Sequence, residues 1–311
     1  MNEVASPAGD GAPPPLVSVI IASVNGLPSI VECLAALVNQ KAGVPYEVLV
    51  LDCCDERTRD EIRRLFPQPE VRLIPMEERL SIPKLRALGM TRARGRMIAI
   101  LEDHCNVGPD WFRGIERAHA AGHEAIGGPV ENGAVDRLTD WAAFFCEYVR
   151  FMPPLAPGVV SEIAGSSAVY DRRLLDRLGP ELQEEVWEYF LHQRIRELSV
   201  PFYCDPDLAV SHKKEFGFGY FMSQRYHYSR SFAGMRLKAA PAWKRVGYAG
   251  ATVILPPLLL WRMATTVWRK GRHGKTFLQA TPILAIFLVS YAWGEAVGAL
   301  LGPGDSLARV E

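Results

Sequence analysis

Three short apolar runs constrain the fold of this 311-residue chain more than any other feature. They cover residues 16–22, 46–51 and 97–101, and the segments between them have the apolar spacing of helices. Strands that are apolar on both faces and alternate with helices are typical of a mostly parallel sheet with helices on both faces. The sequence therefore predicts an α/β fold.

Polar side chains follow all three runs. Asn25 comes after the first run, Asp52 after the second, and Glu102, Asp103 and His104 after the third. In an open α/β sheet, ligands bind outside the carboxyl ends of the strands. Carboxylate oxygens with an imidazole suit Mg²⁺ or Mn²⁺, and such a metal would hold a phosphorylated substrate. The alternative, left open by this segment alone, is a strand end with solvated charges.

The overall composition excludes some classes of protein. The formal net charge is zero, so nucleic acid is not an expected partner. None of the six cysteines forms a C-x-x-C pair, which indicates reduced thiols rather than a zinc site or a disulfide framework. Residues 1–15 are rich in Ala, Gly and Pro and lack the pattern of a secretory signal, so we expect a disordered lead-in.

Two long apolar stretches, residues 246–268 and 277–301, stand near the C-terminus. A membrane-spanning helix needs about 20 mainly apolar residues, and the second stretch meets this. Pro256-Pro257 is expected to break the first stretch, which leaves two interpretations open for it: a helix in the membrane interface, or a broken or re-entrant span. Trp243, Trp261, Trp268 and Trp293 suit an interfacial belt. We expect residues 241–303 to be a membrane-associated helical segment, followed by a tail at 304–311. A pair of buried helices in a soluble domain is the alternative, and the number of crossings stays open.

Several segments between residues 17 and 235 resemble motifs of one enzyme family, in the same order. The segments are Val17–Asn25 (a first strand), Glu47–Asp52 (a second strand with a terminal Asp), Lys84–Gly89 (A-R-N-x-G), Gly95–His104 (a strand leading to D-x-D), Trp187-Glu188 with Leu191 and Arg194 (E-D-x-x-L-x-x-R), and Gln224–Arg230 (Q-x-x-R-W). The family is the family-2 glycosyltransferases, the inverting GT-A type. The chain departs from its pattern at Cys53, Ala87, Glu102, Trp187 and Ser231.

The resemblance implies a GT-A (Rossmann-like) domain over residues 16–240 that moves a sugar from a nucleotide-sugar donor to a hydroxyl of a lipid-linked or cell-envelope acceptor. It implies Glu188 as the catalytic base and Asp103 and His104 as ligands of Mn²⁺ or Mg²⁺. The donor would be held by Ser23, Asn25, Asp52, Arg86, Glu102, Asp103, Arg225 and Arg230. Gly127, Gly128 and Trp187 would lie on the acceptor side. The partners would be the donor, a lipid or polysaccharide acceptor and the cell membrane, with the catalytic domain in the cytoplasm, since basic loops prefer that side.

Most of these residues also have a structural interpretation. Glu188 would then be a surface glutamate near a helix start, with Glu185 as the fallback base. His104 would be a loop histidine, with Asp103 alone holding metal, and Asp52 a helix N-cap. Arg225 and Arg230 would form a membrane-surface patch. His212 would either contact a metal or phosphate or have only a structural role. Gly127 and Gly128 would only form a β-bulge.

Two other functions compete with glycosyl transfer. One is a non-catalytic nucleotide-sugar binder or membrane scaffold with a degenerate site, which the altered D-x-D favours. The other is a nucleotidyltransferase on a similar sheet. The loop Ser23–Gly26 argues against it, because that loop carries no basic residue.

Overall fold

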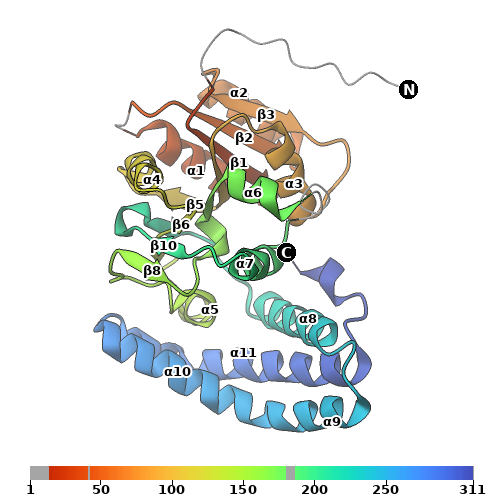
Figure 1. The fold of residues 1–311 in the computed structure, drawn as a ribbon. Coiled ribbons are helices and arrows are strands. Elements are labelled where there is room, and N and C mark those ends of the chain that lie inside the picture. The colour runs from red at the N-terminus through yellow and green to blue at the C-terminus, as the bar shows by residue number, and fades with distance from the viewer. Residues whose placement is uncertain (1–13, 41–42, 180–185, 311) are drawn as a thin grey trace.

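The computed structural model describes residues 14–40, 43–179 and 186–310, and it confirms the α/β fold. Figure 1 shows a sheet with helices on both faces and, below it, a separate layer of C-terminal helices. The expected lead-in therefore lies mostly outside the described residues, and so does the fallback base Glu185.

An eight-stranded sheet forms the centre of the molecule. In spatial order its strands are β3 (Val71–Pro75), β2 (Tyr46–Asp52), β1 (Val17–Ser23), β4 (Met97–Glu102), β9 (Val169–Asp171), β6 (Ala125–Gly127), β10 (Phe202–Cys204) and β8 (Gly158–Val160). The first four are parallel to one another, and β1 and β4 are buried almost throughout, as their continuous apolar runs predict.

The remaining strands make the sheet mixed. Strand β9 runs antiparallel to both β4 and β6, and β8 runs antiparallel to β10. A second sheet has the order β5 (Cys105–Val107), β11 (Val210–His212) and β7 (Val130–Asn132). Strands β6 and β7 follow each other in the chain but belong to different sheets, separated by Gly128-Pro129, where proline has no N–H for a ladder.

Helices cover the sheets, and the apolar spacing between the three runs predicts the first three of them. The helices are α1 (Ser29–Val38), α2 (Glu56–Leu65), α3 (Ile82–Arg92), α4 (Trp111–Ala120), α5 (Leu138–Tyr148), α6 (Arg172–Leu178), α7 (Glu188–Glu197) and α8 (Phe218–Arg236). Short 3₁₀ helices η1 (Gly165–Ser167), η3 (Pro206–Leu208), η4 (Thr252–Ile254) and η5 (Ser306–Arg309) connect other elements.

Capping side chains set where two elements begin. Asp55 caps α2 by accepting a hydrogen bond from the Thr58 amide. Pro206 starts a 3₁₀ turn capped by the Asp205 side chain, so β11 begins only at Val210.

The C-terminal layer consists of α9 (Ala242–Ala251), α10 (Leu255–Lys270) and α11 (Gly274–Leu301). Pro256-Pro257 does not break the first apolar stretch. Both prolines stand in the first turn of α10, where a missing N–H costs little. Two helical stretches in this layer, Ala242–Lys270 and Gly274–Leu301, are long and apolar enough to cross a membrane.

Candidate functional site

The turn between β4 and β5 is hydrogen-bonded to the loop after β1 at the end of the parallel sheet. The Asp103 carboxylate accepts hydrogen bonds from the backbone amides of Val24 and Asn25, both at 2.8 Å, and from Asn25 Nδ2 at 2.6 Å. Its Oδ1 also lies 3.0 Å from His104 Nδ1. Burial alone would raise the pKa of Asp103, but these hydrogen bonds outweigh it and hold the pKa below its usual range.

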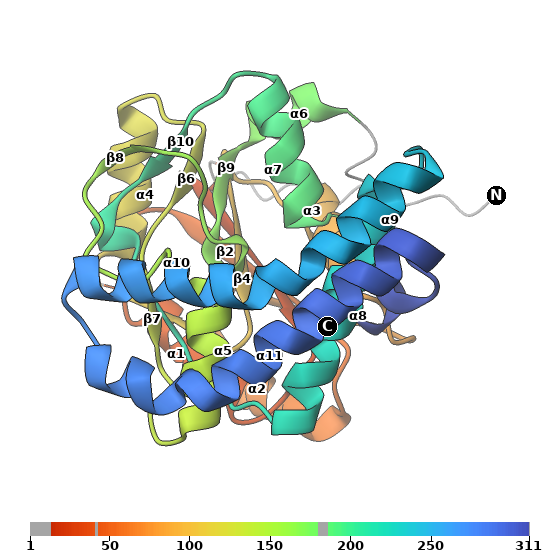
Figure 2. The ribbon, with the colours of Figure 1, turned by 90° about the horizontal axis from the view of Figure 1, so that it is seen from below.

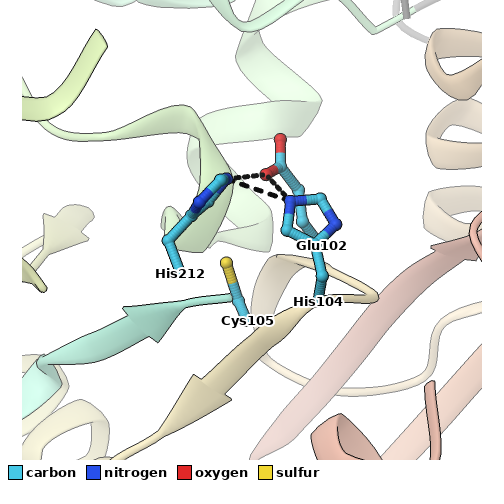
Figure 3. A group of neighbouring side chains, drawn as sticks. All are labelled: Glu102, His104, Cys105 and His212. Carbon is cyan, nitrogen blue, oxygen red and sulfur yellow. Dashed lines mark hydrogen bonds and ion pairs between the residues drawn. The ribbon is translucent and has the colours of Figure 1, made fainter. Parts of the chain in front are cut away.

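Three possible metal ligands meet beside this turn. Figure 3 shows the side chains of Glu102, His104 and His212 pointing toward one another, with Cys105 beneath them. The Nε2 atoms of the two histidines are 3.0 Å apart, and Glu102 Oε2 lies 3.2 Å from the first and 3.5 Å from the second. His212 reaches this place because β11 pairs with β5, with His212 opposite Cys105.

This triangle has the size of a metal-binding site. Ligand atoms about 2.1 Å from a divalent ion, at tetrahedral or octahedral angles, are about 3.0–3.4 Å apart. A proton on His104 Nδ1 donated to Asp103 leaves the lone pair of Nε2 free, as in many carboxylate–histidine–metal arrangements. Glu102, His104 and His212 thus fit a divalent cation. Burial raises the pKa of the Cys105 thiol well above its usual range, and a sulfur ligand is softer than Mn²⁺ or Mg²⁺ prefers.

Asp103 does not belong to this group, which differs from the ligand pair expected from the sequence. Both of its oxygens are occupied by the β1 loop and by His104. In this geometry Asp103 contacts His104, while Glu102 and His212 join His104 as candidate ligands.

A buried arginine connects this group to the expected base. Arg86, on α3, contacts a Glu188 carboxylate oxygen through Nη1 and lies 3.5 Å from Glu102 through Nη2. Glu188 is the first residue of α7, and Gly165 makes room for it, since a Cβ there would lie 2.8 Å from the Glu188 Cγ. Burial raises the pKa of Glu188, and the charge of Arg86 offsets only part of this rise.

A cleft opens next to Glu102, His104 and His212. Its near wall includes Asn25, Arg86 and the residues 102–104, and its far wall is built by α5, α8 and the segment before α8. The far wall contains an ion pair between Glu147 and Arg225, 2.5 Å long, with the guanidinium of Arg225 stacked over the ring of Phe221. The residues of the far wall are Glu147, Tyr148, Lys214, Phe216, Tyr220, Phe221, Gln224 and Arg225.

The structure places two predicted donor contacts, Ser23 and Asp52, beside the cleft rather than among its lining residues. Ser23 donates to Asp52 Oδ1 at 2.7 Å, and Arg59 Nε donates to Asp52 Oδ2 at 2.9 Å. Asp52 is not the N-cap of α2, because Asp55 is. It is a buried carboxylate at the carboxyl edge of the sheet, neutralised by Arg59.

Other predicted residues lie elsewhere. The Nε atom of Arg230 donates to the carbonyl of Gly302 beyond α11, so this arginine is engaged by the C-terminal layer. A side chain would not fit at Gly127 or Gly128, because Ile163 lies against the first and the backbone of Leu208 against the second. Trp187 is half-buried just before α7.

The far wall of the cleft leaves only a weak signal in the sequence. Glu147 is the only acidic residue in the aromatic run 141–151, and a lone carboxylate in an apolar helix usually has a partner. The partner could not be read from the sequence, because Arg225 is 78 residues away and the connection passes through both sheets.

Comparisons with known proteins identify the family and the fold of this chain. Residues 18–179 match Glycosyl transferase family 2. Over 109 residues the chain is 37% identical to the succinoglycan biosynthesis protein ExoO of Rhizobium meliloti (strain 1021), a match that covers 35% of this chain and 31% of that protein. The chain thus matches about a third of the length of this relative.

Two solved structures share the fold. The mannosyltransferase PcManGT of Pyrobaculum calidifontis, in complex with GDP-Man and Mn²⁺, has a TM-score of 0.51 and 17% identity, over 98% of this chain and 90% of that one. GalNAc-T7 with UDP, GalNAc and Mn²⁺ also has a TM-score of 0.51, with 14% identity over 65% of this chain and 44% of the other. These likenesses show that the architecture is of the GT-A type.

Proposed function

We propose a sugar-transfer reaction for this chain, which belongs to glycosyl transferase family 2. It would move a sugar from a nucleotide-sugar donor to a hydroxyl of a lipid-linked or cell-envelope acceptor, with inversion at the transferred carbon. One observation carries the proposal: Arg86 connects the cleft that holds three candidate metal ligands to a buried carboxylate, Glu188.

The candidate ligands Glu102, His104 and His212 would hold Mn²⁺ or Mg²⁺. Two imidazoles in the set favour Mn²⁺, because Mg²⁺ prefers oxygen ligands and keeps its waters. Both solved structures of similar fold contain Mn²⁺, which supports this choice. When bound, such an ion supplies positive charge that stabilises a departing diphosphate.

Glu188 is the proposed general base. The acceptor hydroxyl oxygen forms a bond to the anomeric carbon of the sugar while the bond from that carbon to the donor phosphate oxygen breaks. The hydroxyl proton passes to the Glu188 carboxylate, and the nucleoside diphosphate leaves with the bonding electrons. Burial supports this role because it raises the pKa of Glu188, which makes the carboxylate a stronger base. Attack opposite the leaving group gives inversion.

The position of the cleft supports an amphiphilic acceptor and a membrane location. Its far wall includes α8, and α8 packs against the apolar helix α11 through Phe221 and Phe287, whose ring centroids are 4.7 Å apart. An acceptor with an acyl or prenyl chain would have its apolar part near α11 while its hydroxyl enters the cleft. The relative from succinoglycan biosynthesis supports a polysaccharide acceptor of the cell envelope. We place the catalytic domain on the cytoplasmic side, because the C-terminal segment is basic.

A nucleotide-sugar panel tests the proposal. The full chain in detergent is heated with each donor, with and without Mn²⁺, and the unfolding temperature is followed, because a ligand that binds only the native state raises it. Release of nucleoside diphosphate is then measured for the stabilising donor. We expect one donor to stabilise the protein in a Mn²⁺-dependent way and to be turned over. If donors bind but neither transfer nor hydrolysis occurs in any assay, the non-catalytic binder is the better description.

A further inference from the structure

The underside of the molecule is formed by the C-terminal helices, which run along the catalytic domain instead of projecting from it. Figure 2, seen from below, shows α9 and α10 crossing the domain next to α11. In Figure 1 the same helices lie in one layer beneath α5 and α8. We call the exposed apolar residues of this layer the lower face: Ile254, Leu258, Trp261 and Trp268 on α10 and its approach, and Leu278, Ile286, Val289 and Trp293 on α11.

The lower face consists of one stripe on each helix. The stripe on α10 and the turn before it holds positions 254, 258, 261 and 268, and the stripe on α11 holds positions 278, 286, 289 and 293. Val253, Leu300 and Leu301 are also exposed, before α10 and at the end of α11. Steps of three, four, seven and eight residues return to the same side of a helix. Each helix therefore presents a single apolar side to the outside, with tryptophans that are 55–65% exposed.

The opposite side of α11 is packed against the catalytic domain from one end to the other. Phe277 stacks edge-on with Phe145 of α5 at 5.1 Å, and Gly298 lies directly against the backbone of Arg230 on α8. If α11 crossed a bilayer, α5 and α8 would lie at the same depth. The Glu147–Arg225 ion pair and the cleft would then stand in the hydrocarbon core, where charged groups are costly.

The link between α10 and α11, residues 271–273, and the end of α10 contact the catalytic domain. Arg272 forms an ion pair with Glu131 at 2.7 Å, and Lys270 Nζ contacts the backbone carbonyl of Met152. A hairpin of two spanning helices would put this link across about 30 Å of hydrocarbon from the domain. These contacts require the link and the domain to be on the same side.

The charge of the layer fits an anionic surface. Residues 242–294 contain seven Lys and Arg residues and no Asp or Glu. Lys244, Arg262, Arg269 and Lys275 are exposed. The acidic residue that follows, Glu295, is buried and accepts hydrogen bonds from Arg236 and Tyr248, so it faces the protein. A basic, tryptophan-rich apolar face is typical of helices that lie in the headgroup region of anionic membranes.

We propose that α9, α10 and α11 bind an anionic lipid bilayer with their axes in the plane of the membrane, and that none of the three crosses it. This deepens the membrane location proposed above. It does not depend on sugar transfer, since membrane binding and topology are measured without donor. The cleft would then open close to the lipid surface, with α8 between the cleft and the lower face.

Vesicle flotation of the full chain tests the partner. We expect the detergent-depleted protein to float with phosphatidylcholine vesicles that contain phosphatidylglycerol, and several-fold less with pure phosphatidylcholine. Val289→Glu, on the lower face, should lower binding about tenfold or more. Val159→Glu is the matched control, because Val159 is similarly exposed but lies on β8. Equal loss in both variants, or binding that ignores lipid charge, would overturn the proposal.

Cysteine labelling tests the topology and needs no change in the apolar surface. Lys275→Cys places an exposed thiol next to the link, and Val159→Cys marks the catalytic domain. Sealed membrane vesicles of each orientation are treated with a membrane-impermeant maleimide, with the unsubstituted chain as the background. In-plane binding predicts that both positions react from the same side. A spanning hairpin predicts that position 275 reacts only from the opposite side, and this result would refute the proposal.

Discussion

Arg86 holds the carboxylate of Glu188 from inside the protein, with its guanidinium 8% and the Glu188 side chain 18% exposed. The same guanidinium approaches Glu102, so one buried cation lies between the candidate base and the candidate metal ligands. Substitutions of Arg86 and Glu188 therefore separate proton transfer from donor binding.

Glu188→Gln should lower the rate of transfer by about 10²–10⁴-fold, because the amide cannot accept the proton of the acceptor hydroxyl. The affinity for the donor should change little, since the proposed contact of Glu188 is with the acceptor hydroxyl and not with the donor. Steady-state kinetics and donor titration measure the two effects. Glu197→Gln, at the exposed end of the same helix, serves as the control. A variant with unchanged turnover would remove Glu188 from the mechanism.

The pH dependence of the transfer rate should report the interaction of Arg86 with Glu188. Transfer requires ionised Glu188, so the rate should rise with pH through its raised pKa. Arg86→Met removes a charge that lowers this pKa and should move the acidic limb of the profile to higher pH. Arg194→Met, on the same helix but half-exposed, should leave the limb in place. Because the folded pKa exceeds the unfolded one, the contribution of Glu188 to stability is full at low pH and is lost as the pH rises through the folded value.

His212→Asn should abolish the Mn²⁺-dependent part of donor binding, because it removes one of three ligand atoms that lie within 3.5 Å of one another. Isothermal titration with Mn²⁺ measures the loss directly. His119→Asn is the control, since His119 lies on α4 and is partly exposed. Full Mn²⁺ affinity in the His212 variant would show that the ion binds elsewhere.

Much of the sheet could be predicted from the sequence, because its parallel strands are apolar on both faces and local periodicity reports such burial. The register of β1 with β2 brings Ser23 opposite Asp52, as expected for two strand ends on one edge. The candidate site was only partly predictable. The D-x-D pattern predicts a metal site at residues 102–104, but the sequence does not show which carboxylate is left without backbone partners.

The reason is that hydrogen bonds from distant backbone decide the role of a carboxylate. Asp103 is occupied by amides of residues 24 and 25, nearly 80 positions away in the chain. Arg230 illustrates the same limit, because its place beside Gly302 depends on how the C-terminal layer folds back on α8. Neither contact leaves a periodic signal in the sequence.

Asp103→Asn tests whether this residue orients His104. The amide nitrogen cannot accept hydrogen bonds, so some of the contacts from Val24, Asn25 and His104 must be lost. We expect a free energy of unfolding lower by about 1–3 kcal/mol and a Mn²⁺ affinity lower by about 10–100-fold. Asp110→Asn, a half-exposed position at the start of α4, should affect neither. Unchanged stability together with lost metal affinity would instead indicate a direct ligand.

The contact of α8 with α11 links the C-terminal layer to the cleft. Adding a single methyl group at Gly298 should test whether this contact positions the cleft. A Cβ at Gly298 would collide with the backbone carbonyl of Arg230, so Gly298→Ala forces the two helices apart. We expect a loss of about 1–3 kcal/mol in the free energy of unfolding. Gly250→Ala, on α9 with open space around it, should be neutral or stabilising, because alanine favours helix. Since α8 also carries Gln224 and Arg225, the Gly298 variant should raise KM as well as lower the melting temperature. A lower melting temperature with unchanged KM would mean that α11 supports the fold of α8 without positioning the cleft.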